Sequence, residues 1–168
     1  MLAKERGATV VATTRNKDKT AQLKKVGADH VLLEGDLEAE IPKLFPRDVD
    51  VILELVGPNQ ILRSLGFSAR FGTMIIAGVL NLGWDAEGFS PVMIPPTRNL
   101  SFYTMTNAGI GSEDDGLESM EGLLAEVLEK VEKGIYPVES FLDKTFKLQD
   151  MGEAHTYMED NRASGRSW

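Results

Sequence analysis

The first half of the chain is dominated by short apolar runs that alternate with helical segments. A glycine follows most of the apolar runs within two residues. Strands buried on both faces of a sheet have such runs, about four to eight residues long. The runs lie at 10–12, 31–33, 49–55 and 71–77. Strands and helices that alternate through short turns are typical of a parallel sheet covered by helices. The sequence therefore predicts an α/β fold with a doubly wound, mostly parallel sheet and helices on both faces.

The helices of this fold are also marked in the sequence. Asn16 is expected to cap a helix over 16–26, because its side chain can accept a hydrogen bond from the first turn. A longer helix is predicted over 117–133 and a last one over 151–161, where apolar residues recur every three or four positions. The Gly- and Pro-rich segment 79–97 interrupts the pattern. A loop of this length is usually functional or part of an interface.

The chain begins partway through a unit of known geometry. Residues 1–15 are typical of the end of a helix, a glycine turn, a buried strand and a polar, basic tip. This is the second half of a dinucleotide-binding βαβ unit, whose first strand and G-x-G-x-x-G turn hold the pyrophosphate. We therefore expect an incomplete Rossmann-like fold, in a single N-terminally truncated domain over 1–168. The missing strand is central in the usual order, so its loss would leave two strand edges open. The alternatives are that the remaining strands close up, that a second chain fills the gap, or that the sequence is a truncated gene product.

Composition disfavours several classes of partner. The formal net charge is −8 and the isoelectric point is near 4.8, which argues against nucleic acid or an anionic membrane. No segment approaches the ~20 apolar residues of a membrane span. The chain has no cysteine, which fits a cytoplasmic location. Its two histidines, His30 and His155, are isolated, so we predict no metal site.

A hydroxyl group and a basic group follow the first strand. An acidic residue at this point of a dinucleotide-binding fold binds a ribose 2′-OH, whereas hydroxyl and basic residues favour a 2′-phosphate. Thr14 and Arg15 occupy the position, and Lys19 lies one helical turn further on. Arginine pairs with phosphate through two hydrogen bonds, and lysine adds a point charge. The residues predict a preference for NADPH. The alternative is that these cations form a solvated helix start.

Glycines mark the ends of two further predicted strands. Val56 and Gly57 follow the run at 49–55, and Gly78 and Val79 follow the run at 71–77. Ligands of open α/β sheets bind beyond the carboxyl ends of the strands, so these backbone groups are placed to line a pocket. The alternative is that each glycine simply ends a strand.

One pair of carboxylates has a spacing that could suit acid–base catalysis. Asp50 and Glu54 lie four residues apart in one predicted strand and so share a face. Paired carboxylates can act as acid and base, but no histidine or nucleophile accompanies them. The sequence has no G-x-S-x-G, H-E-x-x-H or Walker motif. We predict no catalytic residue in this chain.

Taken in order, these segments resemble the cofactor-binding half of the medium-chain dehydrogenase/reductase superfamily. The zinc-independent NADPH:quinone oxidoreductase branch is the most similar. The resemblance covers nearly the whole chain. It is carried by LAKERGATVVATTRNKDKTAQLKKVGADHV at 2–31, VDVILELVG at 49–57, FGTMIIAG at 71–78 and FKLQDMGEAHTYMEDNRASGR at 146–166.

The resemblance implies a reaction and a set of binding residues. The reaction is hydride transfer between NADPH and a quinone, enone or carbonyl substrate. The implied cofactor-binding residues are Thr14, Arg15, Lys19, Val56, Gly57, Gly78, Val79 and Asn161. The first three would face the 2′-phosphate, the next four would lie along the nicotinamide side, and Asn161 would approach the cofactor.

The resemblance also implies partners. In the family, two edge strands pair across a two-fold axis, which indicates a homodimer through residues 100–105, from Leu100 to Met105. The catalytic domain of the family has no counterpart in this sequence, so we expect a fragment that does not turn over alone. The alternative is a non-catalytic scaffold or association module, which dimerises or completes a partner chain through exposed strands.

Overall fold

The computed structural model describes residues 1–79, 85–103, 120–160, 162–163 and 166–167. The chain divides into two compact units. One, which we call the terminal unit, consists of Met1–Leu37 and Glu121–Trp168, and the other, the middle unit, of Glu38–Met120. A single domain over 1–168 remains a prediction.

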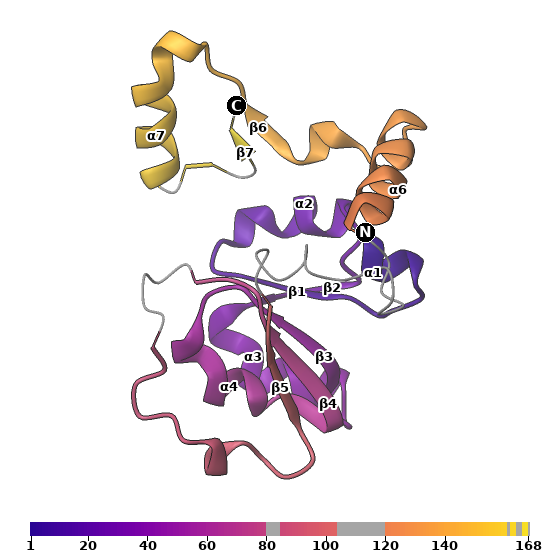
Figure 1. Ribbon diagram of the computed structural model, residues 1–168, viewed down its shortest axis with the longest axis vertical. Helices are drawn as coiled ribbons and strands as arrows, with labels where there is room; N and C mark the ends of the chain where they lie inside the picture. The colour runs from indigo at the N-terminus through magenta and orange to yellow at the C-terminus, as the bar shows by residue number, and fades with distance from the viewer. Residues whose placement is uncertain (80–84, 104–119, 161, 164–165, 168) are drawn as a thin grey trace. The chain divides into compact units, whose positions relative to one another are not determined.

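The terminal unit combines segments from both ends of the chain (Figure 1). Its elements are α1 (Leu2–Glu5), β1 (Val11–Thr14), α2 (Thr20–Lys25), β2 (His30–Leu33), α6 (Met120–Glu132), β6 (Leu142–Lys144), α7 (Met151–Glu159) and β7 (Arg166–Ser167). Strands β1 and β2 are parallel, with Thr14 opposite Leu33. Strands β6 and β7 form a second, short parallel pair.

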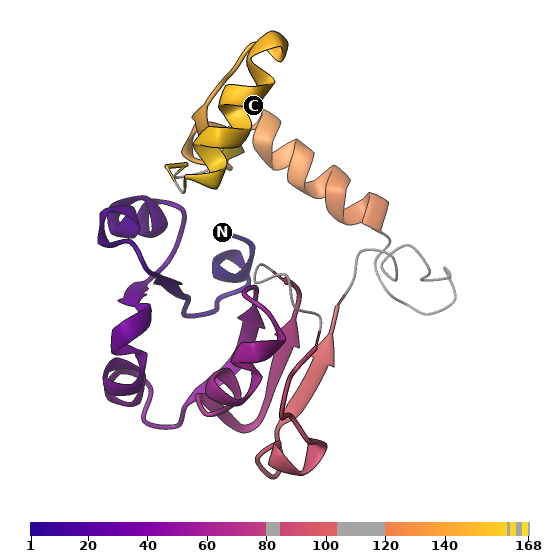
Figure 2. The ribbon, with the colours of Figure 1, turned by 90° about the vertical axis from the view of Figure 1, so that its left-hand side faces the viewer.

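The middle unit contains the larger sheet. Its elements are α3 (Leu37–Leu44), β3 (Val49–Glu54), α4 (Ile61–Leu65), β4 (Ser68–Ile76) and β5 (Asn99–Phe102). The three strands are parallel, in the order β3-β4-β5, and Figure 2 shows them side by side. The predicted α/β fold with parallel strands is confirmed. Over the residues that the structure describes, β1, β2, β3 and β5 each pair with one neighbouring strand. That β1 and β3 flank a missing strand remains a prediction.

The core of the middle unit lies between its sheet and α4. Ile52, Met74 and Leu100 occupy opposite positions in the three strands and therefore share a face. The buried cluster on this face consists of Ile61, Leu65, Met74 and Ile76, with Ile52, Ala86, Phe89, Ile94 and Leu100 packed against it. On the alternate positions of β3, the side chains of Val51 and Leu53 are 63% and 61% exposed. The sheet is therefore well packed on one face only.

Three features differ from the expectations. The apolar spacing of Ile61, Leu62, Leu65 and Ala69 predicts a helix that reaches residue 69. In the structure α4 ends before Gly66, and Ala69 lies in β4. Helix α3 was not predicted, because it is short and contains Pro42. Two apolar residues of the loop at 79–97, Phe89 and Ile94, pack on the core, so part of this loop covers the sheet. The described part of the predicted long helix is α6, and residues 117–119 lie outside the described residues.

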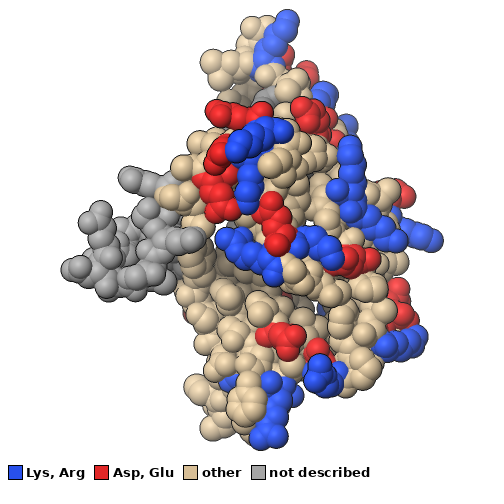
Figure 3. Space-filling view, turned by 90° about the vertical axis from the view of Figure 1, so that its right-hand side faces the viewer, with Lys and Arg blue, Asp and Glu red and all other residues tan. Residues whose placement is uncertain are grey.

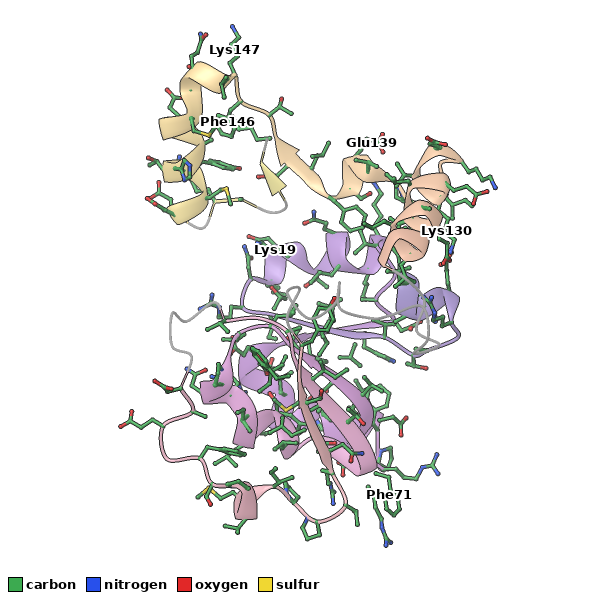
Figure 4. All side chains as sticks on the ribbon, viewed as in Figure 1. Lys19, Phe71, Lys130, Glu139, Phe146 and Lys147 are labelled. Atoms are coloured by element: carbon green, nitrogen blue, oxygen red, sulfur yellow. The ribbon has the colours of Figure 1, made fainter. Side chains whose placement is uncertain are left out.

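A charged cluster joins α1 to α6 within the terminal unit. The Lys130 ammonium, labelled in Figure 4, donates hydrogen bonds to Glu5 at 2.8 Å and to Glu126 at 2.5 Å. The Tyr136 hydroxyl donates to the same Glu5 carboxylate. Lys130, and then Tyr136, lower the pKa of Glu5, while the two carboxylates raise the pKa of Lys130. These contacts hold segments from opposite ends of the sequence together.

The charged surface is mixed. On the face shown in Figure 3, basic and acidic side chains are interspersed. Of the helices in the described ranges, none is long and apolar enough to cross a bilayer.

Candidate functional site

The turn after β1 is fixed by its own side chains. The Thr14 hydroxyl accepts a hydrogen bond from the Asn16 N–H at 3.1 Å and donates to the Asn16 carbonyl at 3.2 Å. The Asn16 side chain in turn accepts from the Asp18 N–H at 2.8 Å. It caps the turn Lys17–Lys19 that leads into α2, so the predicted capping role of Asn16 is confirmed. The chain thereby passes from strand to helix within a few residues, and Arg15 lies at this turn.

Arg15 extends into solvent beside an acidic residue. Its side chain is 85% exposed, and its Nε lies 3.8 Å from the Glu34 carboxylate. Glu34 directly follows β2, and Thr14 and Leu33 are opposite each other in the two strands. Residues 15 and 34 therefore leave the sheet at the same end. An exposed ion pair of this length contributes little, so the guanidinium can turn to another anion. A prediction that these two strands pair in parallel could have indicated that Glu34 lies near Arg15.

Lys19 already has a partner within the terminal unit. Its ammonium, labelled in Figure 4, donates a hydrogen bond to the Ala163 carbonyl at 3.0 Å. Ala163 lies two residues after Asn161 in the sequence, and Asn161 itself lies outside the described residues. The structure therefore brings Lys19 to the C-terminal segment.

The ends of β3 and β4 lie against each other in the middle unit. The Ala77 N–H donates to the Glu54 carbonyl at 2.9 Å. A Cβ atom added to Gly78 would lie 2.2 Å from the Leu55 carbonyl oxygen, so only glycine fits without a backbone shift. Gly57 has a φ of 139°, another conformation that favours glycine. The structure thus brings together the two predicted strand ends, Val56 with Gly57 and Gly78 with the half-buried Val79.

Glu54 is the residue whose role the sequence did not reveal. Its side chain is buried, with 7% exposure. One carboxylate oxygen accepts from the Val56 N–H at 2.8 Å, and the other accepts from the Ser64 hydroxyl at 2.6 Å. Asp50, with which it was paired in the sequence, is exposed. The register of β3 shifts between Val49 and Val51, so the start of the strand is irregular. A glutamate inside an apolar run that ends at Gly57-Pro58 is the sequence feature that could have indicated a buried, hydrogen-bonded carboxylate.

A depression of about 350 Å³ lies beside α7 in the terminal unit. It is lined by Lys144, Phe146, Gly152, Glu153, Thr156, Tyr157 and Arg162. The Lys144 ammonium lies 4.5 Å from the centre of the Phe146 ring, which Figure 4 labels. The Tyr157 hydroxyl donates to Asp143 at 2.8 Å, and this carboxylate raises the pKa of Tyr157. Of the predicted cofactor residues that the structure describes, none lines this depression. In the part of the chain that the structure covers, no group of three or more His, Cys, Asp or Glu residues could hold a metal ion.

Comparison with known proteins decides the family. A family model described as zinc-binding dehydrogenase matches residues 1–121. The chain belongs to this family. This match confirms the resemblance to the medium-chain dehydrogenase/reductase superfamily. A probable quinone oxidoreductase from Leishmania amazonensis is 30% identical over 77 residues, which are 45% of this chain and 23% of that protein.

Solved structures show the same fold. An Escherichia coli quinone oxidoreductase complexed with NADPH is 23% identical and superposes with a TM-score of 0.76, over 99% of this chain and 50% of that one. A quinone oxidoreductase from Pseudomonas syringae is 18% identical and superposes with a TM-score of 0.78, over 99% of this chain and 50% of that one. These similarities confirm the Rossmann-like fold. The chain spans about half the length of these solved chains, and the segment that matches the Leishmania relative covers 23% of that protein.

Proposed function

We propose that this chain is the NADPH-binding part of an oxidoreductase that transfers hydride between NADPH and a quinone, enone or carbonyl substrate. The single observation that carries the cofactor preference is the exposed Arg15 guanidinium beside Thr14, directly after β1. The names of two similar proteins support the class: one is a probable quinone oxidoreductase, and the other is a quinone oxidoreductase complexed with NADPH. We also propose that it works in the cytoplasm, with a further catalytic domain.

The residues present fit a 2′-phosphorylated nucleotide. Arginine offers a planar fork of N–H donors that matches a phosphate, and Arg15 is exposed enough to use it. Lys19 and Asn161 are proposed as further cofactor contacts. When bound, NADPH supplies the hydride, and the residues of this chain bind and orient it.

The backbone at the ends of β3 and β4 is proposed to lie along the nicotinamide. The residues proposed for this role are Val56, Gly57, Gly78 and Val79. The close approach of Gly78 to Leu55 supports it, because it fixes the shape of this surface before any ligand binds. A preformed surface avoids the cost of ordering on binding.

Reversing the charge of Arg15 tests the proposed function. Arg15→Glu is expected to weaken NADPH binding by about 10- to 100-fold, because hydrogen bonds to a charged group contribute about 1.5–3 kcal/mol. NADH binding should not weaken, since NADH has no 2′-phosphate and an acidic residue at this position can bind its ribose 2′-OH. Calorimetric titration with both cofactors measures the two affinities.

Lys17→Glu is the matched control for this experiment. It makes the same charge change on an exposed residue two positions away, and we expect it to alter NADPH binding far less. Failure of the unchanged chain to bind NADPH, or an equal effect of Arg15→Glu on both cofactors, would contradict the proposal.

A second candidate function is association. It is favoured by the exposure of Val51 and Leu53 on β3, since an uncovered apolar strand is unusual at a protein surface. In this candidate the chain is a scaffold that dimerises or completes a partner chain. For the homodimer we propose the edge strand β5 and the residues after it, up to Met105. Residues 104–105 lie outside the described residues.

The proposed homodimer is tested by sedimentation equilibrium. We expect the unchanged chain to sediment as a dimer at micromolar concentration, and Tyr103→Asp to shift it to a monomer, because a buried charge opposes pairing at this edge. Leu62→Asp places the same charge on an exposed apolar side chain of α4 and should leave the dimer intact. A monomeric unchanged chain would exclude this assembly.

A further inference from the structure

Glu54 is a buried carboxylate that the proposed cofactor site does not use. Burial of an ionised carboxyl group is costly unless donors satisfy its oxygens. Here both oxygens have donors, Val56 N–H at 2.8 Å and Ser64 Oγ at 2.6 Å. One donor belongs to the turn after β3 and the other to α4. The carboxylate therefore joins the turn to the helix behind it.

The hydrogen bond to Val56 ends the strand. The backbone of β3 pairs with β4 as far as the bond from the Ala77 N–H to the Glu54 carbonyl. Two residues later the Val56 N–H bonds to the Glu54 side chain instead of a neighbouring strand. Gly57 then takes its positive φ, and the buried Pro58 begins the next turn. The side chain of Glu54 thus bonds to the backbone where it leaves the sheet.

Glu54 is not placed to touch a ligand. It is 7% exposed, and its two oxygens are engaged by residues of its own unit. An effect of this residue on binding must therefore pass through the backbone of Val56 and Gly57.

We propose that Glu54 is a positioning residue, which holds Val56 and Gly57 in the conformation that receives the nicotinamide end of the cofactor. This inference rests on the proposed function. It adds a residue that acts on one end of the ligand only, since the 2′-phosphate end is assigned to Thr14 and Arg15.

Two ligands separate this role from a general loss of structure. NADPH carries the nicotinamide, whereas adenosine 2′,5′-bisphosphate carries the 2′-phosphate without it. Glu54→Ala is expected to weaken NADPH binding roughly five- to tenfold, the effect of one or two lost hydrogen bonds. Binding of the bisphosphate should stay within twofold. Glu54→Gln should restore NADPH binding, because its amide can accept from Val56 and donate to Ser64.

Glu38→Ala is the matched control. It also removes a carboxylate that bonds to α4, through Arg63 at 2.7 Å, but this pair lies at the surface. We expect it to change neither affinity. If Glu54→Ala fails to fold, Ser64→Ala removes one donor only and should weaken NADPH binding to a smaller extent, again without an effect on the bisphosphate.

Amide hydrogen exchange adds a readout that needs no cofactor. In Glu54→Ala the Val56 amide should exchange faster, while amides of the core strand β4 keep their protection. Equal binding of NADPH by the unchanged chain and Glu54→Ala would overturn the inference, and so would an equal loss for both ligands. Absence of NADPH binding by the unchanged chain would overturn the proposed function, and the positioning role with it.

Discussion

Gly78→Ala is expected to destabilise the middle unit by about 3 kcal/mol or more, at the upper end of the range for overpacking. The added Cβ would lie 2.2 Å from the Leu55 carbonyl oxygen and 2.8 Å from its carbon. Both are backbone atoms, so no side chain can rotate to make room. The ends of β3 and β4 would have to separate. Urea unfolding, followed by amide exchange in β4, measures the loss.

Gly35→Ala is the control for this substitution. A Cβ at Gly35 meets no atom within 4 Å, and its backbone has no positive φ. Because Gly35 lies in the terminal unit, we expect Gly35→Ala to leave the free energy of unfolding of the middle unit unchanged and to change that of the terminal unit by about 1 kcal/mol or less, of either sign. Similar stabilities for the two variants would show that the strand ends are further apart than described.

Leu65→Ala is expected to cost about 2–5 kcal/mol of the free energy of unfolding of the middle unit. The Leu65 side chain is 1% exposed and packs with Ile61, Met74 and Ile76. Its truncation leaves a cavity that the sheet and α4 cannot fill without moving. The midpoint of urea unfolding at constant slope measures the effect.

The same helix provides the comparison for Leu65. Leu62 lies three residues earlier in α4 and is 46% exposed. Leu62→Ala should cost less than about 1 kcal/mol, since surface substitutions rarely exceed this value. Equal costs at the two positions would mean that α4 packs through a different face.

The fold could be predicted from the sequence because its signals are local. Short apolar runs are visible at β1, β3 and β4 without knowledge of their neighbours, and a glycine follows those at β3 and β4 within a few residues. The predicted ends of elements are wrong where two patterns disagree. At Ala69 the helical spacing of apolar residues continues, although Gly66 already ends α4. Helix α3 was missed because eight residues with an internal Pro42 give a weak helical pattern.

The candidate site was less predictable because its contacts join separate segments. Thr14 and Arg15 were found from their place after a strand, but Glu34 approaches Arg15 only through the pairing of β1 with β2. Glu54 has its second partner in Ser64, ten residues away on a helix. Neither relation has a spacing that a single sequence reveals. The roles of Val56, Gly57, Gly78 and Val79 in cofactor binding stay predictions.

The terminal unit is built from two segments far apart in the sequence, and this affects when it can fold during synthesis. Its contacts join the first residues of the chain to residues more than a hundred positions later, as in the Lys130–Glu5 pair, whose separation is 125 residues. The middle unit is one continuous segment. Domains generally fold as they leave the ribosome, and closing a long loop slows folding. The middle unit can therefore fold while the chain is still being made, whereas α1, β1 and β2 wait for α6 before their unit is complete.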